Sequence, residues 1–310
     1  MVIVDAHAHV FPEVRGHCAD GPTLGAGYGR VVAGVQPMLL VPGCGEVTAH
    51  LAATLIAQMD WAGVDKAVLL QGPYYGECNQ CVRQAVEQFP TRLAGAAYVD
   101  PWQIDGRRRT LESLLLSGFC AAKIELSVQA GLCAIYPDAR LDDPELAWLW
   151  DVLERRGLVL VLDLGSVGSR AYQTEAARAI ALEHPRLRMV IAHLAKPTPV
   201  AEADPRLWAL WQEQLDLGRL PNVWFDTASL LNYAFEESYP FPTAERYLRL
   251  AIERIGPEKV LWGTDTPALT LTATYKQMAE LAKLHTRFLP APDQALVLGE
   301  NALRVFGISR

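Results

Sequence analysis

The 310-residue chain lacks the features that mark membrane proteins and nucleic-acid-binding proteins. No apolar run is long enough to cross a bilayer, and the first residues lack the charged region and long apolar stretch of a secretory signal. Lysine and arginine form no extended run; the densest cluster is Arg107-Arg108-Arg109, in a chain of net charge −7. We therefore expect neither a membrane nor a nucleic acid as a partner.

Cysteine is also scarce. A disulfide-stabilised scaffold carries many cysteines at close spacing, whereas the six cysteines of this chain are scattered. Their sparseness argues against a disulfide framework and fits a reducing compartment, so we expect a cytoplasmic protein. These residues are Cys18, Cys44, Cys78, Cys81, Cys120 and Cys133.

The sequence has no internal linker, no low-complexity tract and no glycine-rich fingerprint after its first apolar run, which argues against an open dinucleotide-binding sheet. Eight short apolar runs alternate with amphipathic segments. Their Val, Leu and Ala residues show no alternation with polar residues, which predicts parallel strands buried on both faces. Eight such units predict an α/β fold, a (β/α)8 TIM barrel that forms a single domain over residues 1–310. The predicted strands are Val2–Ala6, Ala67–Gln71, Leu93–Val99, Phe119–Leu126, Leu158–Leu164, Met189–His193, Val223–Thr227 and Val260–Thr264.

The predicted helices lie between these strands, and two of the connections are long. Residues 10–45 follow the first strand and 228–242 follow the seventh, so both lie at the C-terminal face, where barrel enzymes build their sites. We expect long loops that form lids or substrate walls, with plain solvated loops as the alternative. The predicted helices are Glu46–Ala62, Glu77–Phe89, Gly106–Leu116, Pro144–Arg156, Ala171–Glu183, Arg206–Leu217, Thr243–Ile255 and Thr270–His285.

Polar residues gather at the ends of the predicted strands. His7 and His9 close the first strand two residues apart, so their side chains point the same way and two imidazoles converge, as they do on a metal ion. Charged groups are rarely buried without a partner, so polar strand ends suit a site built around a metal or an anionic substrate. The other strand-end residues are Lys123 and Glu125 on the fourth strand, Asp163 on the fifth, His193 on the sixth, Asp226 on the seventh and Asp265 on the eighth.

Some of these residues have a structural alternative. Lys123 and Glu125 lie two apart and are as consistent with a buried ion pair as with substrate binding, in which Lys123 would hold an anionic group. Asp226 is expected to cap the turn after its strand. Tyr74, just past the second strand, is a candidate for the wall of a substrate site.

Four motifs resemble those of the amidohydrolase superfamily. Val4-Asp5-Ala6-His7-Ala8-His9 resembles its opening D-x-H-x-H motif, and Ile191-Ala192-His193-Leu194 resembles its sixth-strand motif. Leu261-Trp262-Gly263-Thr264-Asp265-Thr266-Pro267 resembles its eighth-strand G-T-D motif, and the segment 301–306 resembles its tail. Together they indicate the amidohydrolase-related branch, which includes aminocarboxymuconate-type and aromatic-acid decarboxylases and dicarboxylate lactonases.

The resemblance implies a role for each matched residue. His7 and His9 are expected to be metal ligands, Asp265 a ligand and proton acceptor, and His193 an electrophile or acid–base group. Zinc is the metal that the resemblance implies, and imidazole and carboxylate ligands suit it. We therefore expect a hydrolase that cleaves a lactone, ester or amide bond in a small carboxylated substrate, with a metal-activated water and Asp265 as base.

One residue departs from the family pattern. Metal-binding members of this branch carry a histidine at the end of the fifth strand, where this chain has Asp163. In one interpretation Asp163 is a fourth ligand, which suits zinc or manganese. In the other, metal affinity is lost and the enzyme is a metal-independent lactonase, with Asp265 as general base and the histidines stabilising an oxyanion.

Two further functions remain as alternatives, and so does the state of assembly. A non-oxidative decarboxylase of an aromatic or enoic acid would use the same residues, although Asp163 fits that group less well. A barrel that binds a ligand without turnover is the other alternative. A homodimer is expected, because barrels of this type often pair.

Overall fold

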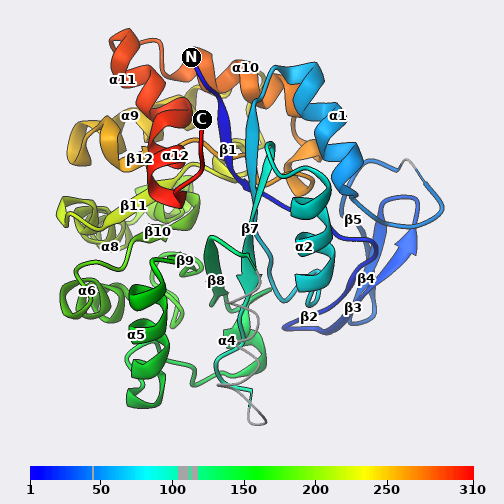
Figure 1. Ribbon diagram of the computed structural model, residues 1–310, viewed down its shortest axis with the longest axis horizontal. Coiled ribbons are helices and arrows are strands. Elements are labelled where there is room, and N and C mark those ends of the chain that lie inside the picture. Colours follow the sequence, from blue (N-terminus) through cyan, green and yellow to red (C-terminus); the bar gives the residue numbers. More distant parts are fainter. Residues whose placement is uncertain (44, 104–111, 113–117) are drawn as a thin grey trace.

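The computed structural model describes residues 1–310 except 44, 104–111 and 113–117. Its main sheet has eight parallel strands, each paired with the next along the chain, and Figure 1 shows them surrounded by helices. The predicted TIM barrel is therefore confirmed. Strand interiors such as Val159–Asp163 are buried throughout, as expected for a sheet covered on both faces. The strands are β1 (Val4–Ala8), β6 (Lys66–Leu69), β7 (Leu93–Tyr98), β8 (Ala121–Glu125), β9 (Val159–Asp163), β10 (Met189–Ile191), β11 (Val223–Asp226) and β12 (Val260–Leu261).

The barrel closes between β1 and the segment that follows β12. The Ala6 N–H donates to the Trp262 carbonyl at 2.9 Å, and the Asp265 N–H donates to the His7 carbonyl at 2.8 Å. The His9 N–H donates to the Thr266 carbonyl at 2.8 Å. These bonds continue the parallel pairing past the end of β12. The first and last strands of the barrel therefore join at its C-terminal face.

A buried carboxyl group reinforces this seam. Asp5 has no exposed surface, and it accepts hydrogen bonds from the Thr264 hydroxyl at 2.6 Å, the Thr264 N–H at 2.9 Å and the Tyr275 hydroxyl at 3.0 Å. Burial raises the pKa of Asp5 to about 6, although these donors oppose the rise. The side chain thus joins β1, the segment after β12 and α10 at one point.

Helices cover the outside of the barrel, close to the predicted positions. Their starts follow from local sequence: Asp204 caps α8 ahead of Pro205, and Thr274 and Gln277 form a capping box on α10. The helix predicted at 46–62 begins only at Ala52, and the one predicted at Gly106–Leu116 falls, apart from Glu112, outside the described residues. The main helices are α1 (Ala52–Ala62), α2 (Asn79–Gln88), α5 (Ala147–Arg156), α6 (Thr174–Glu183), α8 (Pro205–Leu215), α9 (Pro242–Ile255), α10 (Tyr275–His285) and α12 (Asn301–Phe306), with shorter turns at α4 (Leu132–Ile135), α7 (Pro199–Ala203) and α11 (Ala291–Ala295).

Residues 10–45 are not the long loop that the sequence predicts. Residues 15–39 form a four-stranded antiparallel sheet, β2 (Arg15–Cys18), β3 (Gly21–Gly27), β4 (Arg30–Ala33) and β5 (Gln36–Leu39), beside the barrel in Figure 1. Two of the glycines that suggest a loop, Gly29 and Gly34, lie at its turns: Gly34 has φ +60°, and a Cβ there would lie 2.1 Å from the Asp20 carbonyl oxygen. We call residues 15–39 the insertion sheet.

The insertion sheet is fixed to the C-terminal face of the barrel. The Arg15 and His17 N–H groups donate to the Tyr75 and Pro73 carbonyls at 3.1 and 2.9 Å. The Ala19 N–H, in the turn after β2, donates to the Gln129 carbonyl at 2.8 Å, so β2 and this turn reach the loops after β6 and β8. The other long connection, 228–242, contains a 3-10 turn at Leu230–Ala234, whose apolar side chains are buried. Among the described helices, none has the length and apolar character needed to span a membrane.

We expect Thr264→Val to destabilise the fold. The substitution keeps the side-chain shape and removes the hydroxyl that donates to Asp5, leaving a buried carboxyl with one partner fewer. The free energy of unfolding should fall by about 1–3 kcal/mol, measured by urea denaturation. Thr272→Val is the control, because its hydroxyl bonds to Asn232 at an exposed site. Equal stability of the two variants would contradict a structural role for the Asp5 cluster.

Candidate active site at the C-terminal face

A cavity of about 500 Å³ opens at the C-terminal face of the barrel. One wall comes from the insertion sheet and the segment after it, through Cys18, Asp20, Ala33, Met38 and Leu40. Tyr74 also lines the cavity, as the sequence predicts, and its hydroxyl donates to the Met38 sulfur at 3.3 Å. The strand-end residues in the lining are His9, Lys123, Glu125, Asp163, His193 and Asp265.

His7 is completely buried and is oriented by Asp226. Its Nδ1 lies 3.0 Å from Asp226 Oδ2. Burial opposes the charged form of Asp226, but His7 holds the pKa of this carboxyl below its usual range, so the carboxylate is an acceptor. Burial also lowers the pKa of His7, which leaves a neutral ring that carries its proton on Nδ1. Its Nε2 therefore presents a lone pair, and this buried atom has no hydrogen-bond partner.

His9 meets Asp265 in a similar way. Its Nδ1 lies 2.9 Å from the Leu70 carbonyl oxygen, which can only accept, so the proton is on Nδ1. Burial lowers the pKa of His9 to about 4, and the neutral ring then has a lone pair on Nε2. That atom lies 2.9 Å from Asp265 Oδ1. Burial would raise the pKa of the Asp265 carboxyl, but the neighbouring histidines, chiefly His9, hold this pKa well below its usual range. A lone pair on His9 Nε2 then faces the carboxylate oxygen, an arrangement that a shared divalent cation would stabilise.

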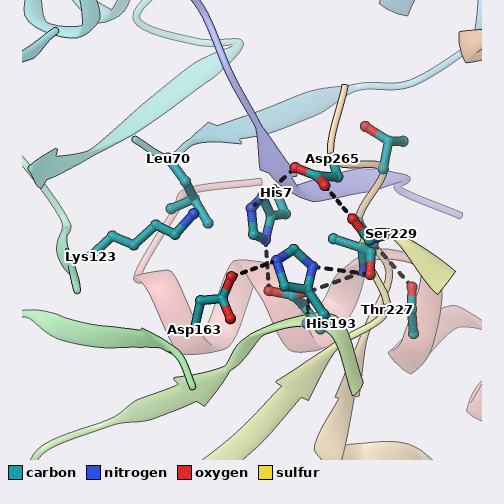
Figure 2. A network of polar contacts seen from close by, with 12 residues as sticks. His7, Leu70, Lys123, Asp163, His193, Thr227, Ser229 and Asp265 are labelled. Carbon is teal, nitrogen blue, oxygen red and sulfur yellow. Dashed lines mark hydrogen bonds and ion pairs between the residues drawn. The ribbon is translucent and has the colours of Figure 1, made fainter. Parts of the chain in front are cut away.

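Three ligand atoms thus converge on one point. The ligand atoms of His7, His9 and Asp265 all lie within 4.8 Å of one another, and Figure 2 shows His7 beside Asp265. Two imidazole nitrogens and a carboxylate oxygen suit a divalent transition metal. His7, His193 and Asp226 form a second group of the same size, but Asp226 is already engaged with both histidines. The first group therefore fits a metal better.

His193 faces the cavity from a left-handed turn after β10. The φ angles of residues 193–196 are all between +50° and +61°, which is unusual for residues other than glycine. The His193 N–H donates to Asp226 at 2.9 Å, and Nδ1 lies 3.1 Å from the Ala228 carbonyl. Burial disfavours the charged ring, but Asp163, 3.2 Å from Nε2, raises the pKa of His193 overall. The ring is thus held as an imidazolium that donates from both nitrogens.

Asp163 lies in the same cavity and has a different set of partners. Its carboxylate is 2.9 Å from the Lys196 ammonium and 3.2 Å from His193 Nε2, the contact drawn in Figure 2. It also accepts from the Gly165 N–H at 2.9 Å. Among the described residues, Asp163 belongs to neither of the two groups that converge within metal-binding distance. Its role as a metal ligand stays a prediction, and the contacts that it makes are ionic.

Lys123 and Glu125 form an ion pair on the cavity wall. The Lys123 ammonium lies 3.5 Å from Glu125 Oε2, and the lysine side chain is 2% exposed. Ser127 donates to the other Glu125 oxygen at 3.4 Å. Burial raises the pKa of Glu125, and Lys123 opposes that rise. The ion-pair alternative is confirmed, and substrate binding by Lys123 and Glu125 stays a prediction.

Two residues of the site, Ser229 and Lys196, are absent from the sequence prediction, and a third, Asp226, has more partners than the sequence predicts. Asp226 does cap its turn, since the Ala228 N–H donates to it at 3.0 Å, but it also orients His7 and positions His193. Ser229 donates a short hydrogen bond to Asp265 Oδ2. Lys196 lies beyond the end of its strand, and only the left-handed turn brings it to Asp163. The strand-end position of Asp226 is a sequence signal for a site residue, whereas the sequence carries no such signal for Ser229 or Lys196.

Comparison with protein-family models places residues 4–308 within the amidohydrolase model. An L-fucono-1,5-lactonase of Burkholderia ambifaria is 31% identical over 142 residues, 44% of this chain and 47% of that protein. The chain thus matches about half the length of this relative. An L-fucono-1,5-lactonase of Burkholderia multivorans is 24% identical over 98% of this chain and 96% of that protein.

Solved structures share the fold. A probable 2-pyrone-4,6-dicarboxylic acid hydrolase from Acinetobacter baumannii, with citric acid bound, has a TM-score of 0.69 at 19% identity, over 99% of this chain and all of that one. An amidohydrolase from Burkholderia multivorans with bound zinc has a TM-score of 0.73 at 19% identity, over the full length of both chains. At this identity the likeness concerns the fold.

We expect Asp226→Asn to weaken metal binding. The amide oxygen can keep the bonds to the His193 and Ala228 N–H groups, so the amide NH₂ faces His7 Nδ1 and moves the ring proton to Nε2. Affinity for Zn²⁺ should fall by about 10–100-fold, measured by competition with a chromophoric chelator. Asp216→Asn, which removes a surface ion pair with Arg254, is the control. Unchanged affinity in Asp226→Asn would show that His7 is not a ligand.

Proposed function

Because the chain belongs to the amidohydrolase family, we propose that it is a metal-dependent hydrolase that opens a lactone ring in a small molecule. The observation that carries this proposal is the convergence of the ligand atoms of His7, His9 and Asp265 within 4.8 Å of one another, together with the unpartnered Nε2 of His7. The names of the two curated relatives support the choice of a lactone as the bond that is cleaved.

His7, His9 and Asp265 would hold the metal, which we propose to be zinc, with manganese as the alternative. The zinc bound to a structure of the same fold supports this choice. When bound, such an ion would supply Lewis acidity, which makes a water more acidic and an acyl carbonyl more electrophilic.

Asp265 would act as the base and His193 as the electrophile. Asp265 is ionised and lies at the cavity, so it can accept a proton from the attacking water and return it to the leaving alkoxide. His193, an imidazolium held by Asp163, can stabilise negative charge on the acyl oxygen. In sum, water adds to the acyl carbon, the ring C–O bond breaks, and a hydroxyl and a carboxyl group form.

The substrate expected from the sequence is small and carboxylated. The names of the relatives and the solved structure describe lactones with and without free carboxyl groups, so both kinds belong in an assay. Decarboxylation and metal-independent hydrolysis are the competing outcomes. A cytoplasmic location, on the basis of sparse cysteines, and a homodimer complete the proposal.

We expect the protein to hydrolyse members of a panel of sugar-acid and pyrone lactones, followed by acid release with a pH indicator. Asp265→Asn should lower kcat by about 10²–10⁴-fold, because it removes the base and one metal ligand. Glu280→Gln, an exposed residue of α10, is the charge-matched control. Release of carbon dioxide from aromatic acids without lactone hydrolysis would identify a decarboxylase instead.

Elemental analysis of the purified protein tests the metal. We expect about one zinc per chain, lost in a His7→Ala/His9→Ala double variant together with lactone hydrolysis. Manganese at the same stoichiometry would replace zinc as the assigned metal and leave the assignment of the ligands unchanged. Full activity after exhaustive chelation, with no metal detected, would establish the metal-independent reaction.

A further inference from the structure

The charges that line the cavity bear on which lactone it accepts. Among the described residues of the lining, the cations other than histidine are Lys123 and Lys196, and none is an arginine. The lining carboxylates are Asp20, Glu125, Asp163 and Asp265. With Asp265 assigned to the metal, the three remaining carboxylates balance the two ammonium groups and the His193 imidazolium, so the lining has no cation in excess.

Each lysine is already paired. Lys196 lies 2.9 Å from one Asp163 oxygen and 3.2 Å from the other, and Asp163 is 3% exposed. Lys123 lies 3.5 Å from Glu125 and is almost fully buried. A substrate carboxylate that approached either lysine would meet the paired carboxylate within a few ångströms, in a site where water screens charge poorly.

Hydroxyl groups suit the same array. A hydroxyl can donate to a carboxylate oxygen and accept from an ammonium group at once, and two ammonium–carboxylate pairs can serve two hydroxyls of one molecule. Ser127, Ser166 and Gln129 add uncharged donors and acceptors, and Tyr75 and Tyr233 offer apolar ring surface. The lining thus matches a polyhydroxylated ligand without net charge.

We propose that the Lys123–Glu125 and Lys196–Asp163 pairs form a hydroxyl-binding subsite that selects uncharged, polyhydroxylated lactones and excludes carboxylated ones. This inference rests on the proposed lactonase function and assigns its substrate class. It also assigns Asp163 and Lys196 a role in substrate specificity, which is distinct from the metal-ligand role considered for Asp163.

The test uses lactones that differ only at carbon 6. D-Glucono-1,4-lactone is paired with D-glucaro-1,4-lactone, and the galactono and galactaro lactones form a second pair. We expect the wild-type protein to favour the uncharged member in kcat/KM by about tenfold or more. Glu125→Gln, which leaves Lys123 without a counter-charge, should shift that ratio about tenfold toward the carboxylated member, while Glu280→Gln leaves it unchanged.

Asp163→Asn provides a second variant in case Glu125→Gln does not fold. This substitution removes the counter-charge of Lys196 in the same way. Asp163 also contacts His193, but an effect on His193 applies to both lactones of a pair and cancels in the ratio of their kcat/KM values. A wild-type preference for the carboxylated member, or an unchanged ratio in the folded variant or variants, would overturn the subsite.

Binding of the same pairs to Asp265→Asn, measured by calorimetry, decides the inference independently of turnover. Tighter binding of the uncharged members supports the subsite even when no lactone is opened, a result that would count against the proposed function alone. Equal or tighter binding of the carboxylated members overturns the subsite.

Discussion

The ladder of hydrogen bonds between β1 and the segment after β12 is the constraint on which the site depends. His9 and Asp265 are 256 residues apart, and their side chains meet because the backbone of residues 6–9 pairs with that of residues 262–266. The Asp5 carboxyl fixes the same seam from inside the barrel. Structural closure and chemistry therefore share one set of contacts, and strain at the seam would displace the ligand atoms directly.

Buried carboxylates organise the rest of the site by setting the states of the groups around them. Asp226 keeps the proton of His7 on Nδ1, Asp163 keeps His193 charged, and Glu125 balances Lys123. Each carboxylate is compensated by a cation or by N–H donors, which is the condition for burying it. One histidine thus presents a lone pair and another a proton, and in each case a neighbouring carboxylate sets that state.

Much of this arrangement follows from the sequence because strand period and strand order are local properties. Buried apolar runs located all eight strands, and the parallel order of a barrel brings His7, His9, His193 and Asp265 to one face. The insertion sheet was missed, since its strands are mostly exposed and rich in glycine, so they carry no buried-strand pattern. Lys196 was missed because a left-handed turn of non-glycine residues has no sequence signature. The histidine tautomers depend on partners such as Leu70 and Asp226, far away in the chain.

The insertion sheet lies between β1 and α1, outside the barrel that carries the converging ligand atoms. It supplies one wall of the cavity, yet it is attached through loop residues such as Pro73, Tyr75 and Gln129, and the ligand atoms come from the barrel itself. A relative with a different segment between β1 and α1 would keep the same reaction centre and present it with a different wall. Substrate range in this architecture can therefore diverge through this wall as well as through the Lys123–Glu125 and Lys196–Asp163 pairs, and grafting of residues 15–39 between relatives is a natural route to new specificities.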